Sequence, residues 1–222
     1  MNKVLIVGAS RGIGLEFVRQ YRAAGDSVTA TARSTQGLSS IRALGATALH
    51  LDVADADAAG AGAASMAGAG FDIAILNAGV YGARTQGLEA PTQDEFDAVM
   101  HTNVLGAMRL LPALVPALAD GARLAVLSSR MASMGLRASP AGWLYRASKA
   151  ALNSVLKDTS LVLAGKAICV VLHPGWVRTD MGGAQADIDA ATSVADMRRL
   201  LAALEPSDNG GFFNHDGQTI AW

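Results

Sequence analysis

A tyrosine and a lysine in the stretch Gly142 to Asn153, GWLYRASKAALN, could perform proton chemistry together. Tyr145 and Lys149 are four residues apart, and small or apolar residues recur around them at helical spacing, so a helix would present both on one face. A free tyrosine loses its proton at about pH 10, and a neighbouring ammonium group would lower that pKa by stabilising the phenolate. The pair is therefore a candidate general acid and base. An exposed Tyr and Lys on an amphipathic helix would show the same short pattern, so the assignment depends on partners elsewhere.

A glycine-rich segment near the N-terminus could hold a nucleotide. Lys3 to Val7 is a short apolar run that predicts a buried strand, and the turn GASRGIG joins it to the amphipathic stretch Ile13 to Ala24. Glycines let the backbone approach a pyrophosphate, and amides at the helix N-terminus face its charge. The spacing differs from GxGxxG, and a plain tight connection is the alternative. The candidate cofactor-binding residues of this turn are Gly8, Ser10, Arg11, Gly12, Ile13 and Gly14.

Two arginines bear on the choice of nucleotide. The second predicted strand, Ser27 to Ala32, ends at Arg33, where a site that prefers NAD usually carries an acidic residue. Arg33 and Arg11 could together hold a 2′-phosphate, because guanidinium groups match phosphate geometry. The sequence therefore favours NADP(H) over NAD(H), with two solvated surface arginines as the alternative reading.

The remaining elements alternate along the chain. Further strands are expected at 46–51, 72–76, 122–127 and 168–172, and helices at 54–70, 92–111 and 194–204. Thr92 and Glu95 form a start signal for the second of these helices, and Pro112 and Pro116 should kink or end it. The polar stretch 181–192 is expected to be a flap. The tail, 211–222, is expected to form a hairpin with its turn at Asp216 and Gly217.

Six strands alternating with helices predict an α/β fold with a doubly wound parallel sheet, a Rossmann fold, in one domain over residues 1–222. Ligands of such sheets bind at the carboxyl ends of the strands. The candidate residues at those ends, besides the glycine turn and Arg33, are Asp52, Val53, Asn77, Ala78, Gly79, Ser129, Pro174, Gly175, Val177 and Thr179.

Composition excludes several other classes. A chain of 222 residues that is 51% hydrophobic suits one well-buried domain, and a net charge of −1 gives no basic surface for nucleic acid or an anionic membrane. Cys169 is the only cysteine, and the four histidines lack ligand spacing, so neither a disulfide nor a metal site is expected. No apolar run approaches about 18 residues, and we expect a soluble, cytoplasmic protein.

These motifs, from GASRGIG to HPGWVRT ending at Thr179, resemble the short-chain dehydrogenase/reductase family, and the ending NHDGQTIAW resembles its small carbonyl-reductase and C-factor-like branch. The resemblance implies a catalytic set of Asn103, Ser129, Tyr145 and Lys149. Ser129 would bind the substrate oxygen, Tyr145 would exchange the proton, and Lys149 would lower the tyrosine pKa and bind the nicotinamide ribose. Asn103 would bend its helix and organise a proton-relay water. Because Ser129 lies sixteen residues before Tyr145, a somewhat long gap, Ser128 and Ser133 remain rivals for the serine role.

The resemblance further implies that Asp52 and Val53 border the adenine, that 77–79 line the cofactor and that Thr179 touches the carboxamide. The expected activity is hydride transfer between NADP(H) and a carbonyl or alcohol, in a homo-oligomer, most simply a dimer through the helices carrying Asn103 and Tyr145. A cofactor-binding regulatory or signalling protein of C-factor type is the main alternative, and an epimerase or dehydratase a weaker one. Four large side chains near the inferred site could shape an apolar pocket, but plain packing is the favoured interpretation: Tyr81, Met131, Trp143 and Trp176.

Overall fold

A computed structural model describes residues 1–56, 60, 62 and 65–222, and its centre is a parallel sheet of seven strands in the order β3-β2-β1-β4-β5-β6-β7. This confirms the doubly wound α/β fold in a single domain. The order reverses between β1 and β4, so the carboxyl ends of these two strands open the crevice in which such folds bind ligands. The strands are β1 Lys3–Val7, β2 Ser27–Ala32, β3 Thr47–His50, β4 Phe71–Leu76, β5 Leu118–Leu127, β6 Ala167–His173 and β7 Gly211–Asn214.

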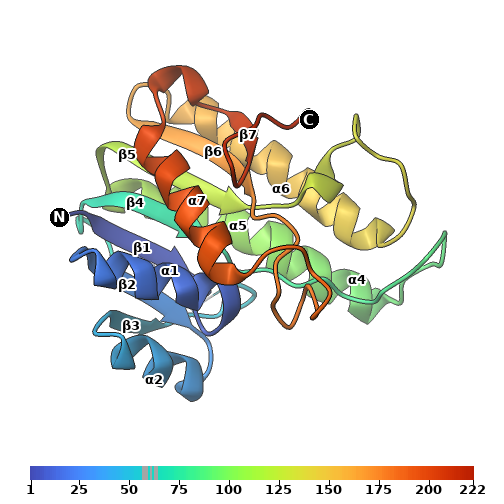
Figure 1. Cartoon of the computed structure of the whole chain (residues 1–222), viewed down its shortest axis with the longest axis horizontal. Helices are drawn as coiled ribbons and strands as arrows, with labels where there is room; N and C mark the ends of the chain where they lie inside the picture. The colour runs from blue at the N-terminus through green and yellow to red at the C-terminus, as the bar shows by residue number, and fades with distance from the viewer. Residues whose placement is uncertain (57–59, 61, 63–64) are drawn as a thin grey trace.

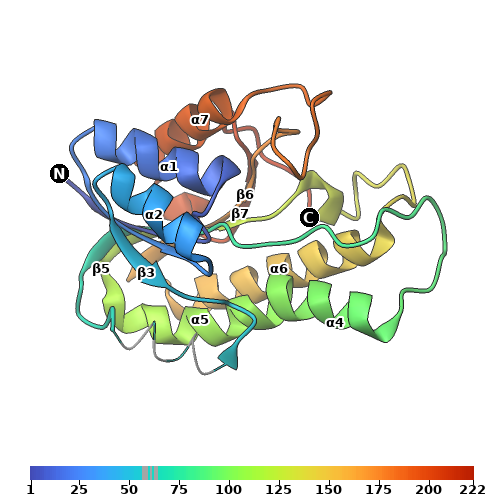
Figure 2. The same cartoon turned by 90° about the horizontal axis from the view of Figure 1, so that it is seen from below.

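Helices cover both faces of the sheet, as Figures 1 and 2 show. One face carries α1 Gly12–Ala23, α2 Thr35–Ala43 and α7 Ala190–Ala203, and the other carries α4 Gln93–Met100, α5 Gly106–Leu114 and α6 Trp143–Val162. Alternate residues of β1 supply the two cores: Val4 and Ile6 pack with α1, whereas Leu5 and Val7 pack with α5 and α6. Because β1 is buried on both faces, it reads in the sequence as a continuous apolar run.

The helical run that carries Asn103 departs from a regular α-helix. Thr92 and Glu95 form the predicted capping box at the start of α4, and the helix then widens into a π-helical turn over His101–Leu105. Pro112 lies inside α5 without ending it, and Pro116 falls in a short 3₁₀ turn, Val115–Ala117. Pro112 therefore does not end the helix, whereas α5 ends at Leu114, just before Pro116, as expected of the second proline.

The same run, Gln93–Ala117, is within the described residues the one helix that by length and composition alone could cross a membrane. It has 25 residues, and 44% of its most apolar window is buried inside the protein. Val99, Leu110 and Leu114 are buried in this run, and Arg109 Nη1 donates a hydrogen bond to the carbonyl oxygen of Ala54. These contacts show that the helical run Gln93–Ala117 packs on one face of the sheet.

The C-terminal tail differs from the prediction, because its first arm is a seventh strand of the main sheet. β7 pairs in parallel with β6, from Val170 opposite Gly211 to His173 opposite Asn214. The turn at Asp216 and Gly217 does form, and it returns the chain to a single antiparallel bridge between Phe213 and Thr219. The predicted turn at Asp216 and Gly217 is therefore confirmed, whereas the pairing of β7 with β6 was not predicted.

Other segments also depart from the expectations. The helix α2 was not predicted, although Ser34 caps it by accepting a hydrogen bond from the backbone amide of Gly37. The flap expected at 181–192 is shorter, because α7 already begins at Ala190 with Asp189 as its N-cap. A β-bridge between Val177 and Ile188 also holds the end of this segment against the chain that leaves β6. The helical crossover predicted at 54–70 lies partly outside the described residues, which omit 57–59, 61, 63 and 64.

Candidate functional site

Tyr145 and Lys149 lie on the buried face of α6. Tyr145 is 7% exposed and Lys149 is 4% exposed, so the alternative of an exposed pair on an amphipathic helix is excluded. The Lys149 ammonium lies 5.9 Å from the centre of the Tyr145 ring and donates a hydrogen bond of 2.8 Å to the carbonyl oxygen of Leu127, at the end of β5. The carboxyl end of β5 and helix α6 thus meet at Tyr145 and Lys149.

The sequence left three serines as candidates for the residue that binds the substrate oxygen, and their hydrogen bonds distinguish them. Ser129, two residues after β5, is the side chain whose hydrogen bonding lowers the pKa of Tyr145, and its hydroxyl also accepts from the amide of Met131 at 3.1 Å. The hydroxyl of Ser128 donates instead to the carbonyl oxygen of Lys149 at 3.4 Å, and that of Ser133 donates to the carbonyl oxygen of Trp222 at 3.2 Å. Ser129 is the one of the three that adjoins the phenol.

Burial dominates the ionisation of the pair. It raises the pKa of Tyr145 to about 12, to which the nearby phenol of Tyr81 adds, while the hydrogen bond from Ser129 opposes the rise. Burial also lowers the pKa of Lys149 to about 8. The expected lowering of the Tyr145 pKa is therefore not found in the protein by itself, because burial disfavours the phenolate. Tyr145 is a neutral phenol at physiological pH.

Asn103 connects the π-helical turn to the rest of the site. Its side-chain nitrogen donates to the carbonyl oxygen of Val80 and to the hydroxyl of Ser148, at 2.8 and 2.9 Å, and its side-chain oxygen accepts from the amide of Val80 at 2.8 Å. The Ser148 hydroxyl in turn donates to the carbonyl oxygen of Tyr145. Asn103 is 1% exposed, so this amide fixes the backbone on both sides of the phenol.

Replacing Asn103 by Ala should lower the free energy of unfolding by about 3 kcal/mol, because buried partners at Val80 and Ser148 lose their hydrogen bonds. The melting temperature should fall by roughly 10 °C. The matched control is Asn153→Ala in α6, because Asn153 is 3% exposed and, among the described residues, its side-chain oxygen has no partner. Urea unfolding of both variants checks this, and equal losses would contradict the role given to the Asn103 amide.

The glycine turn between β1 and α1 packs closely against the turn that follows β4. Gly8 has a φ of 86°, and a β-carbon on it would lie 2.7 Å from the backbone of Ala78. The side-chain amide of Asn77 donates to the carbonyl oxygen of Gly8, and a side chain on Gly14 would collide with both. The two turns therefore line the crevice between β1 and β4 with backbone, as close approach by a phosphate group requires.

The N-terminus of α1 is open to an anion. Among the described residues, no side chain caps this helix and no acidic residue lies in its first turn. A β-carbon on Gly12 would contact the methyl group of Thr179 at 3.4 Å, so the segment after β6 approaches the same helix end. Thus two predicted cofactor segments, far apart in the sequence, lie together.

The other predicted cofactor residues surround this crevice. Ser10 lies against Gly37 of α2, Asp52 accepts a hydrogen bond from the amide of Ala54, and Val53 contacts Gly106. A β-carbon on Gly79 would lie 3.2 Å from both the Asn103 side-chain oxygen and the Lys149 ammonium. The structure places the remaining three around the chain that leaves β6: Pro174, Gly175 and Val177.

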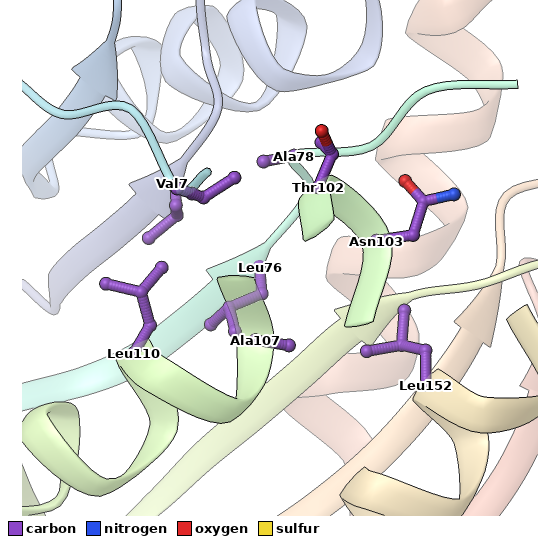
Figure 3. Close-up of a pocket in the computed structure, with 9 residues that line it drawn as sticks. Val7, Leu76, Ala78, Thr102, Asn103, Ala107, Leu110 and Leu152 are labelled. Carbon is purple, nitrogen blue, oxygen red and sulfur yellow. The ribbon is translucent and has the colours of Figure 1, made fainter. Parts of the chain in front are cut away.

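Figure 3 shows a small cavity below the crevice, lined mainly by apolar side chains. Its volume is about 20 Å³, which suffices for about one water molecule. Val7, Leu76 and Leu110 form its walls, and the side chain of Asn103 points away from them. The cavity is too small for a substrate and belongs to the packed floor of the site.

The two arginines assigned to a 2′-phosphate have separate partners. Arg33 Nη1 lies 3.9 Å from the carboxylate of Asp52, whereas Arg11 Nη1 lies 2.7 Å from the carboxylate of Asp180 after β6. Both guanidinium groups are largely exposed, at 65% and 75%. Such pairs contribute little to stability, so either guanidinium is available to a phosphate.

Sequence reasoning left Tyr81 out of the site, but its ring is stacked on that of Tyr145, with centroids 4.5 Å apart. The available signal was its position, two residues after the turn at 77–79. Trp143 and Trp176 donate hydrogen bonds to backbone oxygens of Glu89 and Gly182. Trp176 is 51% exposed, so it does not pack inside the protein as expected.

A doubly wound sheet with a glycine turn at its switch point and a buried Ser-Tyr-Lys site defines a Rossmann-type α/β protein. The family model described as short chain dehydrogenase matches residues 2–189. The chain therefore belongs to the short-chain dehydrogenase family of oxidoreductases.

Individual relatives extend this comparison. The chain is 38% identical over 154 residues to the C-signal of Myxococcus xanthus, covering 68% of this chain and 92% of that protein. Among solved structures, carbonyl reductase Sniffer of D. melanogaster superposes with a TM-score of 0.92 at 29% identity, covering all of both chains. The NADPH-bound carbonyl reductase from chicken fatty liver has a TM-score of 0.89 at 31% identity and is covered to 99%, with all of this chain aligned.

Proposed function

We propose that the chain transfers hydride between NADP(H) and a small carbonyl or alcohol substrate, with Tyr145 as general acid and base. The observation that carries this proposal is the buried phenol hydrogen-bonded to Ser129, with Lys149 beside it, at the sheet edge next to the glycine turn. NADPH is bound in the chicken carbonyl reductase to which the chain is similar.

The chain's own residues fit a dinucleotide. The crevice at Gly8 and Asn77 is lined by backbone, which would let a diphosphate approach closely, and the uncapped first turn of α1 would face its charge. Arg33, at the end of β2, would bind the 2′-phosphate, and Lys149 and Thr179 would hold the nicotinamide end. The cofactor, when bound, supplies or accepts the hydride.

Proton transfer is the part that the protein side chains perform. Ser129 would donate a hydrogen bond to the substrate oxygen and hold it next to the Tyr145 hydroxyl. A phenol with a pKa of about 12 keeps its proton at neutral pH, so Tyr145 is ready to give that proton to the oxygen of a carbonyl.

A direct test is NADPH oxidation, followed by absorbance, against a panel of aldehydes, ketones and quinones. The proposal predicts turnover of at least one class, which the Tyr145→Phe protein lacks. Failure of every substrate, with NADPH binding intact in calorimetry, would contradict the enzymatic proposal.

A second candidate function is an NADP(H)-binding signalling or regulatory protein with little turnover. The similarity to the C-signal of Myxococcus xanthus, at 38% identity, favours this candidate. The substrate panel separates the two, because a regulator would bind NADPH and leave all carbonyls unchanged.

Cofactor selectivity gives a prediction about Arg33. The Arg33→Ala variant should bind NADPH about ten- to a hundredfold more weakly and NADH unchanged, because only the 2′-phosphate loses a charge-assisted hydrogen bond. Arg42→Ala is the matched control, an exposed arginine in the last turn of α2. Fluorescence titration with both nucleotides measures the effect, and equal affinity of the unmodified protein for NADH and NADPH would refute the 2′-phosphate site.

The assembly and location stay predictions. A homodimer would form through the outer faces of α4, α5 and α6, where Phe96, Met108, Leu161 and Val162 are exposed. The cytoplasmic location and the absence of nucleic-acid, membrane and metal partners are expectations from composition.

A further inference from the structure

The ring of Tyr81 covers the ring of Tyr145. The ring centroids are 4.5 Å apart and the planes differ by 22°, a stacked arrangement. Tyr145 is held at its backbone by α6 and at its hydroxyl by Ser129, but a phenol can still rotate and tilt about its side-chain bonds. A stacked neighbour restricts that motion, since the two rings must remain nearly parallel.

The backbone around Tyr81 is fixed on both sides. The preceding residue, Val80, exchanges two hydrogen bonds with the side chain of Asn103. Further along, the carbonyl oxygen of Thr85 accepts from the amide of Gly142, the residue just before α6. The Tyr81 hydroxyl also occupies the space that a side chain on Gly142 would need. Tyr81 is therefore tied to the same helix that carries Tyr145.

Arg84 holds the ring of Tyr81 from outside. Its guanidinium carbon lies 4.9 Å from the centroid of the Tyr81 ring, within the range of a cation–π contact. The same guanidinium donates a hydrogen bond of 2.6 Å to the carbonyl oxygen of Met181, in the segment after β6. Arg84 thus joins the loop after β4, which Figure 2 shows running out from the sheet, to the segment that also approaches the glycine turn.

We propose that Tyr81 is a positioning residue for the proton exchange at Tyr145, and that Arg84 holds it in place. The proposal rests on the proposed function, because it assigns to Tyr81 the orientation of the phenol that gives the proton. Two properties of Tyr81 contribute separately. Its ring restricts the tilt of the Tyr145 ring, and its hydroxyl adds to the rise of the Tyr145 pKa.

Substitutions separate these two properties. The Tyr81→Leu variant should lose roughly tenfold in kcat with little change in the KM for NADPH, because a misdirected phenol affects the chemical step. The Tyr81→Phe variant keeps the ring and should retain kcat, while the alkaline limb of its pH profile moves to lower pH as the pKa of Tyr145 falls. Arg84→Ala, an exposed change that leaves the core intact, should reproduce part of the kcat loss.

The matched control is Tyr21→Phe, because Tyr21 stacks on Phe17 and lies under the guanidinium of Arg198, away from Tyr145. Wild-type kcat in Tyr81→Leu, or a loss in Tyr81→Phe as large as in Tyr81→Leu, would overturn the proposal. Thermal unfolding confirms that each variant is folded.

A second readout does not need turnover. The chain has three tyrosines, so NMR of isotope-labelled tyrosine gives three signals, which single Tyr→Phe variants assign. The Tyr145 signal should titrate at lower pH in both Tyr81 variants and unchanged in Tyr21→Phe. An unaltered Tyr145 signal in both Tyr81 variants would refute the positioning role. Absence of turnover in the wild type, with these shifts present, would instead count against the proposed function alone.

Discussion

Replacement of Tyr145 by Phe is expected to lower kcat by about 10²- to 10⁴-fold, the usual contribution of a positioned general acid. The substitution removes one hydroxyl and keeps the ring that stacks on Tyr81, so the packing of α6 should persist. NADPH affinity should be nearly unchanged, because the crevice at Gly8 and Asn77 is not altered. Steady-state kinetics with the best carbonyl of the panel, together with calorimetric NADPH titration, measures both quantities.

Tyr21→Phe serves as the control for this substitution as well. Tyr21 is buried, and burial also raises its pKa well above the usual value. It is therefore a second buried phenol, packed between Phe17 and Arg198 and not against Tyr145, and its loss should leave kcat intact. Retained turnover in Tyr145→Phe would show that the proton comes from another group.

Replacement of Ser129 by Ala is the second large effect that we expect, a loss of about 10²- to 10³-fold in kcat. Loss of one hydrogen-bond donor to a developing oxyanion has a cost of this size. The pKa of Tyr145 should also rise further, because Ser129 is the partner that lowers it. The same kinetic assay and a pH profile test the two consequences.

The neighbouring serines provide matched controls of the same size and burial. Ser128 and Ser133 are 4% and 0% exposed, and their hydroxyls bond backbone oxygens away from the phenol. Ser128→Ala and Ser133→Ala should therefore keep most of the activity. A larger loss in either control than in Ser129→Ala would transfer the serine role to that residue.

Much of the fold could be predicted because its signals are local. The bounds of β1 and β2 agree with their apolar runs, each ended by a residue that breaks the pattern, Gly8 and Arg33. The capping box at Thr92 also forms as predicted, since both partners lie within one helical turn. In contrast, the pairing of β7 with β6 was not predicted, although the hairpin that begins with β7 was, because four residues carry too little pattern to show a partner strand.

In the candidate site, too, some features could be predicted from local sequence signals and others could not. Residue types and spacing sufficed to name Tyr145 and Lys149 as candidates, and the family resemblance added Ser129, with Ser128 and Ser133 as rivals. The sequence could not show that Tyr81 stacks on Tyr145, because sixty-four residues separate them and stacking depends on the path of a loop. It also could not show the π-helical turn that aims Asn103 at Val80.

The sequence by itself determined six of the seven strands, most of the helices and the residue types at the carboxyl ends of the strands, because hydrophobic period and glycine position act over short distances. Its motifs also carried the resemblance to the family. Only the tertiary structure decided which serine meets the phenol and whether that phenol is charged. Both depend on burial and on contacts between distant segments. Burial raises the pKa of Tyr145, and that burial exists only when the chain is folded.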